Sequence, residues 1–213
     1  MSIQKTYHKY IEVFQSISEK IKSSESTEIF EKRQKAFKKF QKIGLPNHKN
    51  ENYKHANIDD ICSKDYDYSY DSGQTSANLN EFFQCAVEEM DSHVVLLSNG
   101  SYYHDNDKIT DLPEGVVICG FKEATKNYPD IVNKYFDNYA GEIEDGIIAL
   151  NTMLANDGLF IYVPENVEIN KTIQLVNLTH GFGNKNIFKR NLFIVEKNSS
   201  LRLVICDHTL NNS

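Results

Sequence analysis

The sequence predicts a mixed α and β protein in which a helical N-terminal part leads into an array of short strands. Apolar residues recur every three or four positions between 7 and 43, which is the spacing of amphipathic helices. Between 159 and 175 they alternate with polar residues, and turn residues at 157–158 (Asp-Gly) and 164–166 (Pro-Glu-Asn) flank these runs. No long helical crossover separates the strands, so the pattern favours either an antiparallel sandwich or a parallel β-helix over a doubly wound sheet.

Three parts follow one another along the chain. Residues 1–90 are the predicted helical N-terminal domain with its linker, residues 91–146 a hairpin and helices leading to the core, and residues 147–213 the strand array. The array reaches the last residues without a capping helix, although solenoids normally cap their open ends. We therefore expect the front part of a longer protein, or a chain that completes its sheet by association.

Two helices are predicted near the N-terminus. The first covers 7–21, where one stripe is apolar and the opposite face carries Lys, Glu and Ser. The second begins after Ser26 or Thr27, either of which can serve as its N-cap. Gly44 then supplies the left-handed position that ends a helix, and Pro46 cannot continue it.

The middle of the chain gives less regular signals. Tyrosines alternate with Asp or Ser in 58–71, which predicts an exposed strand or an irregular surface segment, and 79–90 returns to helical spacing. Asn-Gly at 99–100 stands between two apolar runs and predicts a hairpin. The segment 121–139 has helical character that Pro129 interrupts.

The strand array itself is expected to begin with a short apolar helix or turn at 147–154. A loop is then predicted at 177–186, because Gly and Asn are frequent there. Further strands are predicted at 191–195 and 201–205, each followed by turn residues or by the end of the chain.

The composition excludes several classes of protein. Hydrophobic residues make up 40% of the chain, which is enough for a core, and 30 acidic against 23 basic residues give a net charge of -7. This balance argues against a nucleic-acid partner. Basic residues do gather between Lys32 and Lys42, but the opposite face of that helix is apolar, so a solvated face is expected.

Membrane and secretory signals are not expected either. No segment approaches the roughly 20 apolar residues of a membrane span, and the first residues lack the apolar core of a signal peptide. We therefore expect a cytoplasmic protein that binds no membrane. The four cysteines, Cys62, Cys85, Cys119 and Cys206, are far apart, so neither a disulfide framework nor a zinc knuckle is predicted.

A resemblance to a known family emerges when scattered residues are taken together in order. A helix that ends in Gly-Leu-Pro, followed by Glu and a Tyr-Lys-His run, resembles the N-terminal signature of the SufD members of the SufB/SufD family of iron-sulfur cluster assembly scaffolds. In that family the run is Glu-x-Trp-[Arg/Lys]-Tyr-Thr, so Tyr53 stands here in place of the Trp. The residues that carry the resemblance are Arg33, Ala36, Phe37, Phe40, Gly44-Leu45-Pro46, Glu51, Tyr53-Lys54-His55, Leu96 to Tyr102, Gly115-Val116, Leu150-Asn151, Asp157-Gly158, Val163-Pro164, Ile173, Arg190-Asn191, Ile194-Val195-Glu196 and Leu201 to Ile205.

The resemblance implies a fold and a set of partners. The expected fold is a helical N-terminal domain followed by the first coils of a right-handed parallel β-helix, which would be truncated in 147–213. The expected partners, in a full-length protein, are the ABC-type ATPase SufC and a SufB-like subunit. A cofactor is not expected in this fragment, although the full complex could hold iron or an iron-sulfur cluster.

Candidate metal ligands are few. Cys206 and His208 lie two positions apart, which places them on one face of an extended strand, and a thiolate with an imidazole can ligate iron or zinc. Two ligands do not make a site, so we treat them as weak candidates. Acidic residues at 142–145 could bind a divalent cation, but an exposed turn is the commoner reason for such a cluster.

Two further groups of charged residues could form sites. Glu51, Lys54 and His55 have mixed charges, which could suggest acid-base chemistry. No nucleophile or paired carboxylate accompanies them at a recognisable spacing, so an ordinary loop is favoured over a catalytic site. Lys185, Lys189 and Arg190 could meet an anion, but Arg190 stands at the start of a strand and is equally suited to an ion pair at the surface or with a partner. No phosphate-binding Gly-x-x-x-x-Gly-Lys-[Ser/Thr] loop occurs, so nucleotide hydrolysis would be the work of a partner.

Two functions of different classes follow. The first is a non-enzymatic scaffold subunit of the SUF iron-sulfur cluster assembly complex, acting through protein-protein contacts, with a homodimer left open. The second is a carbohydrate-active β-helix enzyme, such as a polysaccharide lyase or hydrolase. Such enzymes line successive coils with Asp, Lys or Arg, and the strands at 159–163 and 192–195 contain none of these.

Overall fold

The computed structural model describes residues 3–56, 58–68, 70, 91–104, 109, 111–181 and 183–210. They belong to two compact units, each assembled from segments that are distant in sequence. Unit 1 takes its residues from 1–70, 125–155 and 183–188, and unit 2 from 71–124, 156–182 and 189–213. The helix expected at 79–90 lies outside the described residues, as does Cys85.

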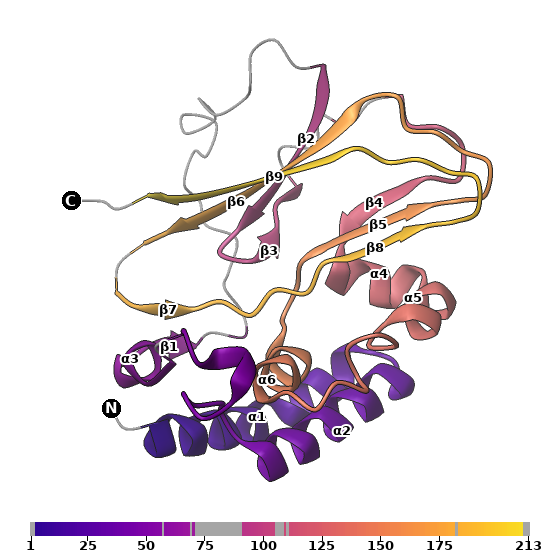
Figure 1. Ribbon diagram of the computed structural model, residues 1–213. Coiled ribbons are helices and arrows are strands. Elements are labelled where there is room, and N and C mark those ends of the chain that lie inside the picture. Colours follow the sequence, from indigo (N-terminus) through magenta and orange to yellow (C-terminus); the bar gives the residue numbers. More distant parts are fainter. Residues whose placement is uncertain are drawn as a thin grey trace. The chain divides into compact units, whose positions relative to one another are not determined.

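Unit 1 is mainly helical, with one short parallel strand pair (Figure 1). Its elements are α1 (Ile3–Ser24), α2 (Thr27–Ile43), the 3-10 turn η1 (Glu51–Tyr53), α3 (Ile58–Ser63), α5 (Pro129–Tyr135), α6 (Gly146–Leu154), β1 (Asp67–Tyr68) and β7 (Lys185–Asn186). The helix α4 (Phe121–Asn127) is shared, because the boundary between the units falls after residue 124.

The two N-terminal helices form as predicted, and α2 begins and ends where its caps indicate. The Oγ of Ser26 accepts a hydrogen bond from the backbone N–H of Ile29 at 3.3 Å. Gly44 adopts φ 72°, and its N–H donates to the carbonyl of Phe40 at 2.8 Å. Pro129 stands at the first position of α5, so the predicted interruption of 121–139 is also confirmed.

The core of unit 1 lies where α2 packs against α1 and α6. Phe40 is fully buried, and burial of one such side chain is worth about 2–3 kcal/mol. Phe14 and Phe37 stack with ring centroids 4.6 Å apart. The buried members of this core are Tyr10, Phe14, Ile21, Phe30, Ala36, Phe40, Tyr70, Ala149, Leu150, Met153 and Leu154.

The prediction of an exposed segment at 58–71 is wrong for part of its length. This region contains α3 and β1, and Tyr70 is buried. The hydroxyl of Tyr70 lies 3.3 Å from the Oγ of Ser24, while the hydroxyl of Tyr68 donates to the carbonyl of Leu154 at 2.8 Å. A tyrosine ring can be buried when its hydroxyl finds such a partner, and sequence alternation does not reveal the partner.

Unit 2 is built on two sheets of short strands. One has the order β3-β2-β6-β9 and the other β4-β5-β8. The strands are β2 (Ser92–Ser98), β3 (Ser101–Tyr102), β4 (Val117–Gly120), β5 (Leu159–Val163), β6 (Thr172–His180), β8 (Leu192–Val195) and β9 (Leu203–Leu210).

The predicted hairpin joins β2 to β3 as an antiparallel pair. Asn99 and Gly100 both have positive φ, 47° and 84°, as a two-residue hairpin turn of this sequence requires. The Oδ1 of Asn99 also accepts the backbone N–H of His180 at 3.0 Å, which ties the turn to the end of β6. The loop expected at 177–186 therefore begins later than predicted, because β6 continues to residue 180 between its two neighbours.

The strands of the array pair in parallel at a nearly constant offset. Phe160 pairs with Leu192, and Ile173 pairs with Leu203, so partners stand 32 and 30 positions apart. Between these pairs, an isolated bridge joins Glu168 to Ser200. A purely antiparallel sandwich is therefore excluded for the described strands. The apolar side chains packed between the strands include Val95, Leu97, Leu159, Ile161, Val163, Ile169, Ile173 and Leu175.

One turn recurs at the same offset. Asn166 and Asn198 both adopt the left-handed conformation, with φ 61° and 58°. The Nδ2 of Asn198 donates to the Oδ1 of Asn166 at 3.0 Å, and the backbone N–H of Asn166 donates to the carbonyl of Lys197 at 3.0 Å. Because Asn tolerates this conformation better than other residues with a side chain, the stacked pair fixes the spacing of the turns.

Asn198→Ala should lower the free energy of unfolding by about 1–2 kcal/mol, because alanine pays the steric cost of left-handed backbone and loses the amide contact. Asn198→Gly loses the same contact without the steric cost and should be less destabilising. Urea unfolding of the two variants measures the difference. If glycine destabilised the protein as much as alanine, the backbone conformation would not be the origin of the effect.

His93 gives unit 2 a dependence on pH. Its side chain is 3% exposed, and its pKa lies below the ordinary 6.5 because burial disfavours the charged ring. The charge of Lys171 lowers the pKa further, whereas Asp91 and Asp111 oppose the shift. The His93 ring therefore takes up a proton more readily in the unfolded chain than in the folded one. The contribution of neutral His93 to the free energy of unfolding is complete above about pH 6.5 and is lost as the pH falls below that value.

The melting temperature should consequently drop between about pH 7.5 and about pH 5, and the drop should be smaller in His93→Gln, which has no proton to take up. Thermal unfolding at several pH values measures both slopes. His55→Gln, at an exposed position, is the control and should keep the slope of the parent protein. An unchanged slope in His93→Gln would contradict the assignment.

Among the helices of the described ranges, none combines the length and the apolar character that crossing a bilayer requires.

Candidate functional site

Cys206 and His208 lie on the same face of β9, as the sequence predicts. They pair with Val176 and Leu178 of β6. The Nε2 of Gln174 lies 3.8 Å from the Sγ of Cys206, within reach of a weak hydrogen bond. The Nε2 of His208 is buried and has no hydrogen-bond partner in the part of the chain that the structure describes.

This cluster offers a thiol and an imidazole, with an amide at its edge. Soft metal ions prefer thiolate and imidazole ligands, so the chemistry of the pair is suitable. A closed site needs further ligands, and no group of three or more His, Cys, Asp or Glu side chains suited to a metal occurs among the described residues. Metal binding by Cys206 and His208 stays a prediction.

The acidic cluster at 142–145 contains a structural residue. Asp145 is the N-cap of α6, and its Oδ1 accepts the backbone N–H groups of Ile147 and Ile148 at 2.8 and 3.0 Å. Its Oδ2 accepts the hydroxyl of Tyr53 at 2.7 Å. The carboxylate of Asp145 is thus already engaged at both oxygens.

The residues of the Glu51 to His55 segment do not converge on a catalytic arrangement. Lys54 forms an exposed ion pair with Glu51, and His55 is exposed. Tyr53 instead turns inward to Asp145. Burial raises the pKa of Tyr53 to about 12, and the hydrogen bond to the Asp145 carboxylate adds to this shift, so the phenol stays a donor at neutral pH.

The Gly-Leu-Pro motif meets the same helix end. A Cβ placed on Gly146, the first residue of α6, would lie 1.8 Å from the carbonyl oxygen of Gly44. Gly44 and Tyr53 stand nine positions apart in the family-like motif, and both contact the N-terminus of α6. We conclude that this motif joins the end of α2 to the start of α6.

The basic residues at 185–190 have separate roles. Lys185 belongs to β7 in unit 1, where it pairs in register with Asp67. Lys189 belongs to unit 2, and its Nζ lies 3.3 Å from a carboxylate oxygen of Asp207. An ion pair is expected for Arg190 from the sequence, and the structure shows one for its neighbour Lys189.

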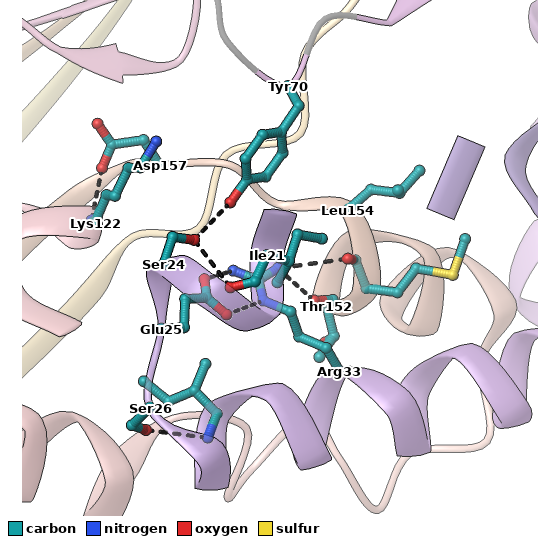
Figure 2. Close-up of polar contacts among 12 residues, drawn as sticks. Ile21, Ser24, Glu25, Ser26, Arg33, Tyr70, Lys122, Thr152, Leu154 and Asp157 are labelled. Carbon is teal, nitrogen blue, oxygen red and sulfur yellow. Dashed lines mark hydrogen bonds and ion pairs between the residues drawn. The ribbon is translucent and has the colours of Figure 1, made fainter. Parts of the chain in front are cut away.

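A buried ion pair in unit 1 is not apparent from sequence spacing. Arg33 is fully buried and Glu25 nearly so, with side chains 0% and 3% exposed. The Nε and Nη2 of Arg33 donate to the two carboxylate oxygens of Glu25 at 2.7 and 2.5 Å, and Nη1 donates to the carbonyl of Thr152 at 3.0 Å (Figure 2). This fork joins the start of α2 to α6.

The electrostatics of this pair are those of a structural element. Burial by itself lowers the pKa of Arg33, but the charge and hydrogen bonds of Glu25, together with the smaller electrostatic contributions of Tyr70 and Tyr68, outweigh burial and raise the pKa above its ordinary value. Arg33 therefore stays charged. An arginine on an otherwise apolar helical stripe was the available signal, because a buried guanidinium needs an acidic partner.

Asp157 is a second buried acid, after Glu25. The sequence indicates it only as part of an Asp-Gly turn. Its carboxylate oxygens accept the backbone N–H groups of Tyr102 and Lys122, both at 2.9 Å. Figure 2 shows the contact with Lys122. Burial raises its pKa, and these N–H donors oppose the shift. Asp157 thus links β3, α4 and the start of β5.

Gly158, the second residue of the Asp-Gly pair, occupies a position where a side chain would not fit. A Cβ at Gly158 would lie 2.2 Å from the carbonyl oxygen of Arg190, so two backbone segments 32 positions apart touch here. Asp157 and Gly158 therefore both hold neighbouring segments of unit 2 together.

Comparison with known proteins gives the same assignment for most of the chain. Residues 4–175 match the family described as the SufBD protein N-terminal region. An iron-sulfur cluster assembly SufBD family protein of Arabidopsis thaliana, ABCI9, is 26% identical over 191 residues, which cover 80% of this chain and 40% of that protein. The iron-sulfur cluster assembly protein SufD of Bacillus subtilis is 30% identical over 92 residues, covering 43% of this chain and 21% of that protein.

The chain thus spans well under half the length of these curated relatives. The match over 4–175 nevertheless runs from α1 into the first residues of β6. It therefore includes all the described helices, the hairpin and β5, but not β7 of unit 1. The chain belongs to the SufB/SufD family and corresponds to the N-terminal region of its members.

Proposed function

We propose that this chain is the N-terminal part of a scaffold subunit for iron-sulfur cluster assembly and that it acts through protein-protein contacts, without catalysis of its own. The observation that carries the proposal is the family match over 4–175, together with relatives named as iron-sulfur cluster assembly proteins. The structural roles found for Arg33, Asp145 and Asp157 support it, since these buried or engaged groups hold elements together.

The proposed architecture of unit 2 is the start of a right-handed parallel β-helix. The parallel pairing of β5 with β8 and of β6 with β9, at offsets of 32 and 30 residues, supports successive coils. The asparagine pair at 166 and 198 supports a turn repeated from coil to coil. Right-handed connections between parallel strands are the general rule, which supports the handedness.

The open edge of the array is the proposed place for the next coil. β8 and β9 each have a neighbour on one side only within the described sheets. Val195, Val204 and Ile205 on these strands are 42%, 37% and 50% exposed, which is unusual for large apolar residues of a strand array. Covering them would remove apolar surface from water and satisfy the free backbone groups.

The coil proposal can be tested by hydrogen exchange on this chain and on a full-length version. Amides of β9 should exchange at least tenfold more slowly in the longer protein, because an edge strand becomes internal. Amides of β6 are internal in both and serve as the control. Equal exchange of β9 in the two proteins would contradict stacking at this edge.

The proposed partners of the full-length protein are an ABC-type ATPase of the SufC type and a SufB-like subunit, with the cluster or its iron as cargo. Affinity purification of the tagged full-length protein from its source cell should retain the ATPase. A preparation that retains no such ATPase would contradict the scaffold role, whereas sedimentation of this chain alone would show whether it also forms a homodimer.

The proposed location is the cytoplasm, as the sequence predicts, although one relative from Arabidopsis thaliana is named as chloroplastic. The carbohydrate-active alternative gains no specific support. β5 and β8 pair directly, and their residues, LFIYV and LFIV, include none of the acidic or basic groups with which such an enzyme would line its coils.

A further inference from the structure

A concave site of about 220 Å³ lies within unit 1, between α2, α6 and the segment 137–141. Its lining includes Lys32, Lys35 and Lys39, which stand three and four positions apart and therefore share one face of α2. Ala36 and Ile148 contribute to its apolar part. We call this site the lysine groove.

The ammonium groups of Lys32 and Lys39 donate hydrogen bonds to uncharged carbonyl acceptors. Lys32 donates to the carbonyls of Asn133 and Phe136, and Lys39 donates to the carbonyl of Gly141. A carbonyl satisfies hydrogen bonding but leaves the positive charge in place. Lys35 is exposed and forms no hydrogen bond or ion pair with the described residues.

Acidic groups compensate only part of this charge. Asp137 lines the groove, and its Oδ1 accepts the hydroxyl of Thr152 at 3.0 Å. Glu144, with a largely exposed side chain, approaches Lys39 only to 3.9 Å. Burial lowers the pKa of Lys32; the charge of Asp137 opposes this shift and that of Lys35 adds to it, as expected where positive charges crowd together.

The lysine groove is positively charged, although the chain as a whole carries a negative net charge. The protein carries a net charge of -7, yet three lysines face one small concavity with one lining carboxylate. A concave wall focuses the field of such a cluster and raises the local concentration of anions. A lining that combines lysines with apolar side chains matches a ligand that has an apolar body and an anionic head.

We propose that the lysine groove binds a small organic dianion, either a phosphate monoester or a dicarboxylate, with its charged oxygens at Lys32, Lys35 and Lys39 and its apolar body against Ala36 and Ile148. This site is independent of the proposed assembly function, because it lies wholly in unit 1 and uses none of the strand edges. Lys35 is the residue available to make a new contact.

Isothermal titration and amide-proton NMR of the whole chain test the site with phenyl phosphate and phthalate. If only phenyl phosphate binds, the ligand is a phosphate monoester. If only phthalate binds, the ligand is a dicarboxylate. Either result supports the site, and binding should shift amide signals of 32–39 and 137–152. If neither probe binds at concentrations up to about 10 mM, where even a ~4 kcal/mol interaction is visible, the proposal is wrong.

Three variants separate the groove from general electrostatics. Lys35→Gln should weaken binding about three- to tenfold, while Lys38→Gln, on the same helix but outside the groove, should change it less than about twofold. Asp137→Asn should tighten binding about threefold by removing the competing charge. Asn suits this position because residue 137 has φ 62° and an amide oxygen can still accept the Thr152 hydroxyl.

Equal losses in Lys35→Gln and Lys38→Gln would overturn the proposal, since only the overall charge would then matter. Weaker binding by Asp137→Asn would overturn it too, as would phenol binding as tightly as phenyl phosphate. Circular dichroism of each variant before titration confirms that the fold is retained. Lys35 and Lys38 are both exposed, so neither change removes a buried group.

Discussion

Arg33→Met should lower the free energy of unfolding by about 3–5 kcal/mol. The substitution keeps an apolar stem of similar length but leaves the carboxylate of Glu25, 3% exposed, without its cation and without two hydrogen bonds. It also leaves the carbonyl of Thr152 without the guanidinium donor. Urea unfolding monitored by circular dichroism at constant pH measures the loss.

The control for this effect lies two positions along the same helix. Lys35→Met removes a cation from an exposed position and should change stability by less than about 0.5 kcal/mol. A double variant, Arg33→Met with Glu25→Leu, should recover most of the lost stability, because apolar residues often replace buried ion pairs without cost. If the double variant were as unstable as Arg33→Met, the uncompensated charge would not be the cause.

Gly146→Ala should cost about 3 kcal/mol or more, which is at the upper end of overpacking effects. The added Cβ would lie 1.8 Å from the carbonyl oxygen of Gly44 and 3.0 Å from its carbon, and both are backbone atoms that cannot rotate away. The end of α2 and the start of α6 would have to separate. The same urea experiment, or the shift in melting temperature, measures the effect.

Gly183→Ala is a suitable comparison, because a Cβ there meets nothing within 4 Å. Its φ of 82° still disfavours alanine, so a cost of about 1–2 kcal/mol is expected from the backbone alone. A Gly146→Ala protein no less stable than Gly183→Ala would show that α6 can move away from Gly44 without loss.

The elements that sequence reasoning located well are those with local signals. Ser26, Gly44 and Pro129 mark helix ends because capping and proline geometry involve only neighbouring residues. Asn99 and Gly100 mark the hairpin for the same reason. The parallel partners of the array could not be assigned in this way, since the pairing of Ile173 with Leu203 depends on a segment 30 residues away.

The site residues divide similarly. Cys206 and His208 share a face of β9 as their spacing predicts. The partners of Arg33, Tyr53 and Asp157 could not be predicted, because each lies far along the chain or depends on a turn. The lysine groove shows the same limit, since the sequence indicates a basic helix face but not the segment 137–141 that makes it concave.

The way unit 1 is assembled bears on how the protein folds during synthesis. The hydroxyl of Tyr10 in the first helix accepts a hydrogen bond from the Nδ2 of Asn186 at 2.7 Å, and its ring lies against Phe188. α1 can therefore complete its packing only after residue 188 has left the ribosome, which takes on the order of 10 s or more at usual translation rates. Until then the contacts of Tyr10 with residues 186 and 188 are missing, so part of the apolar face of α1 stays uncovered in the nascent chain.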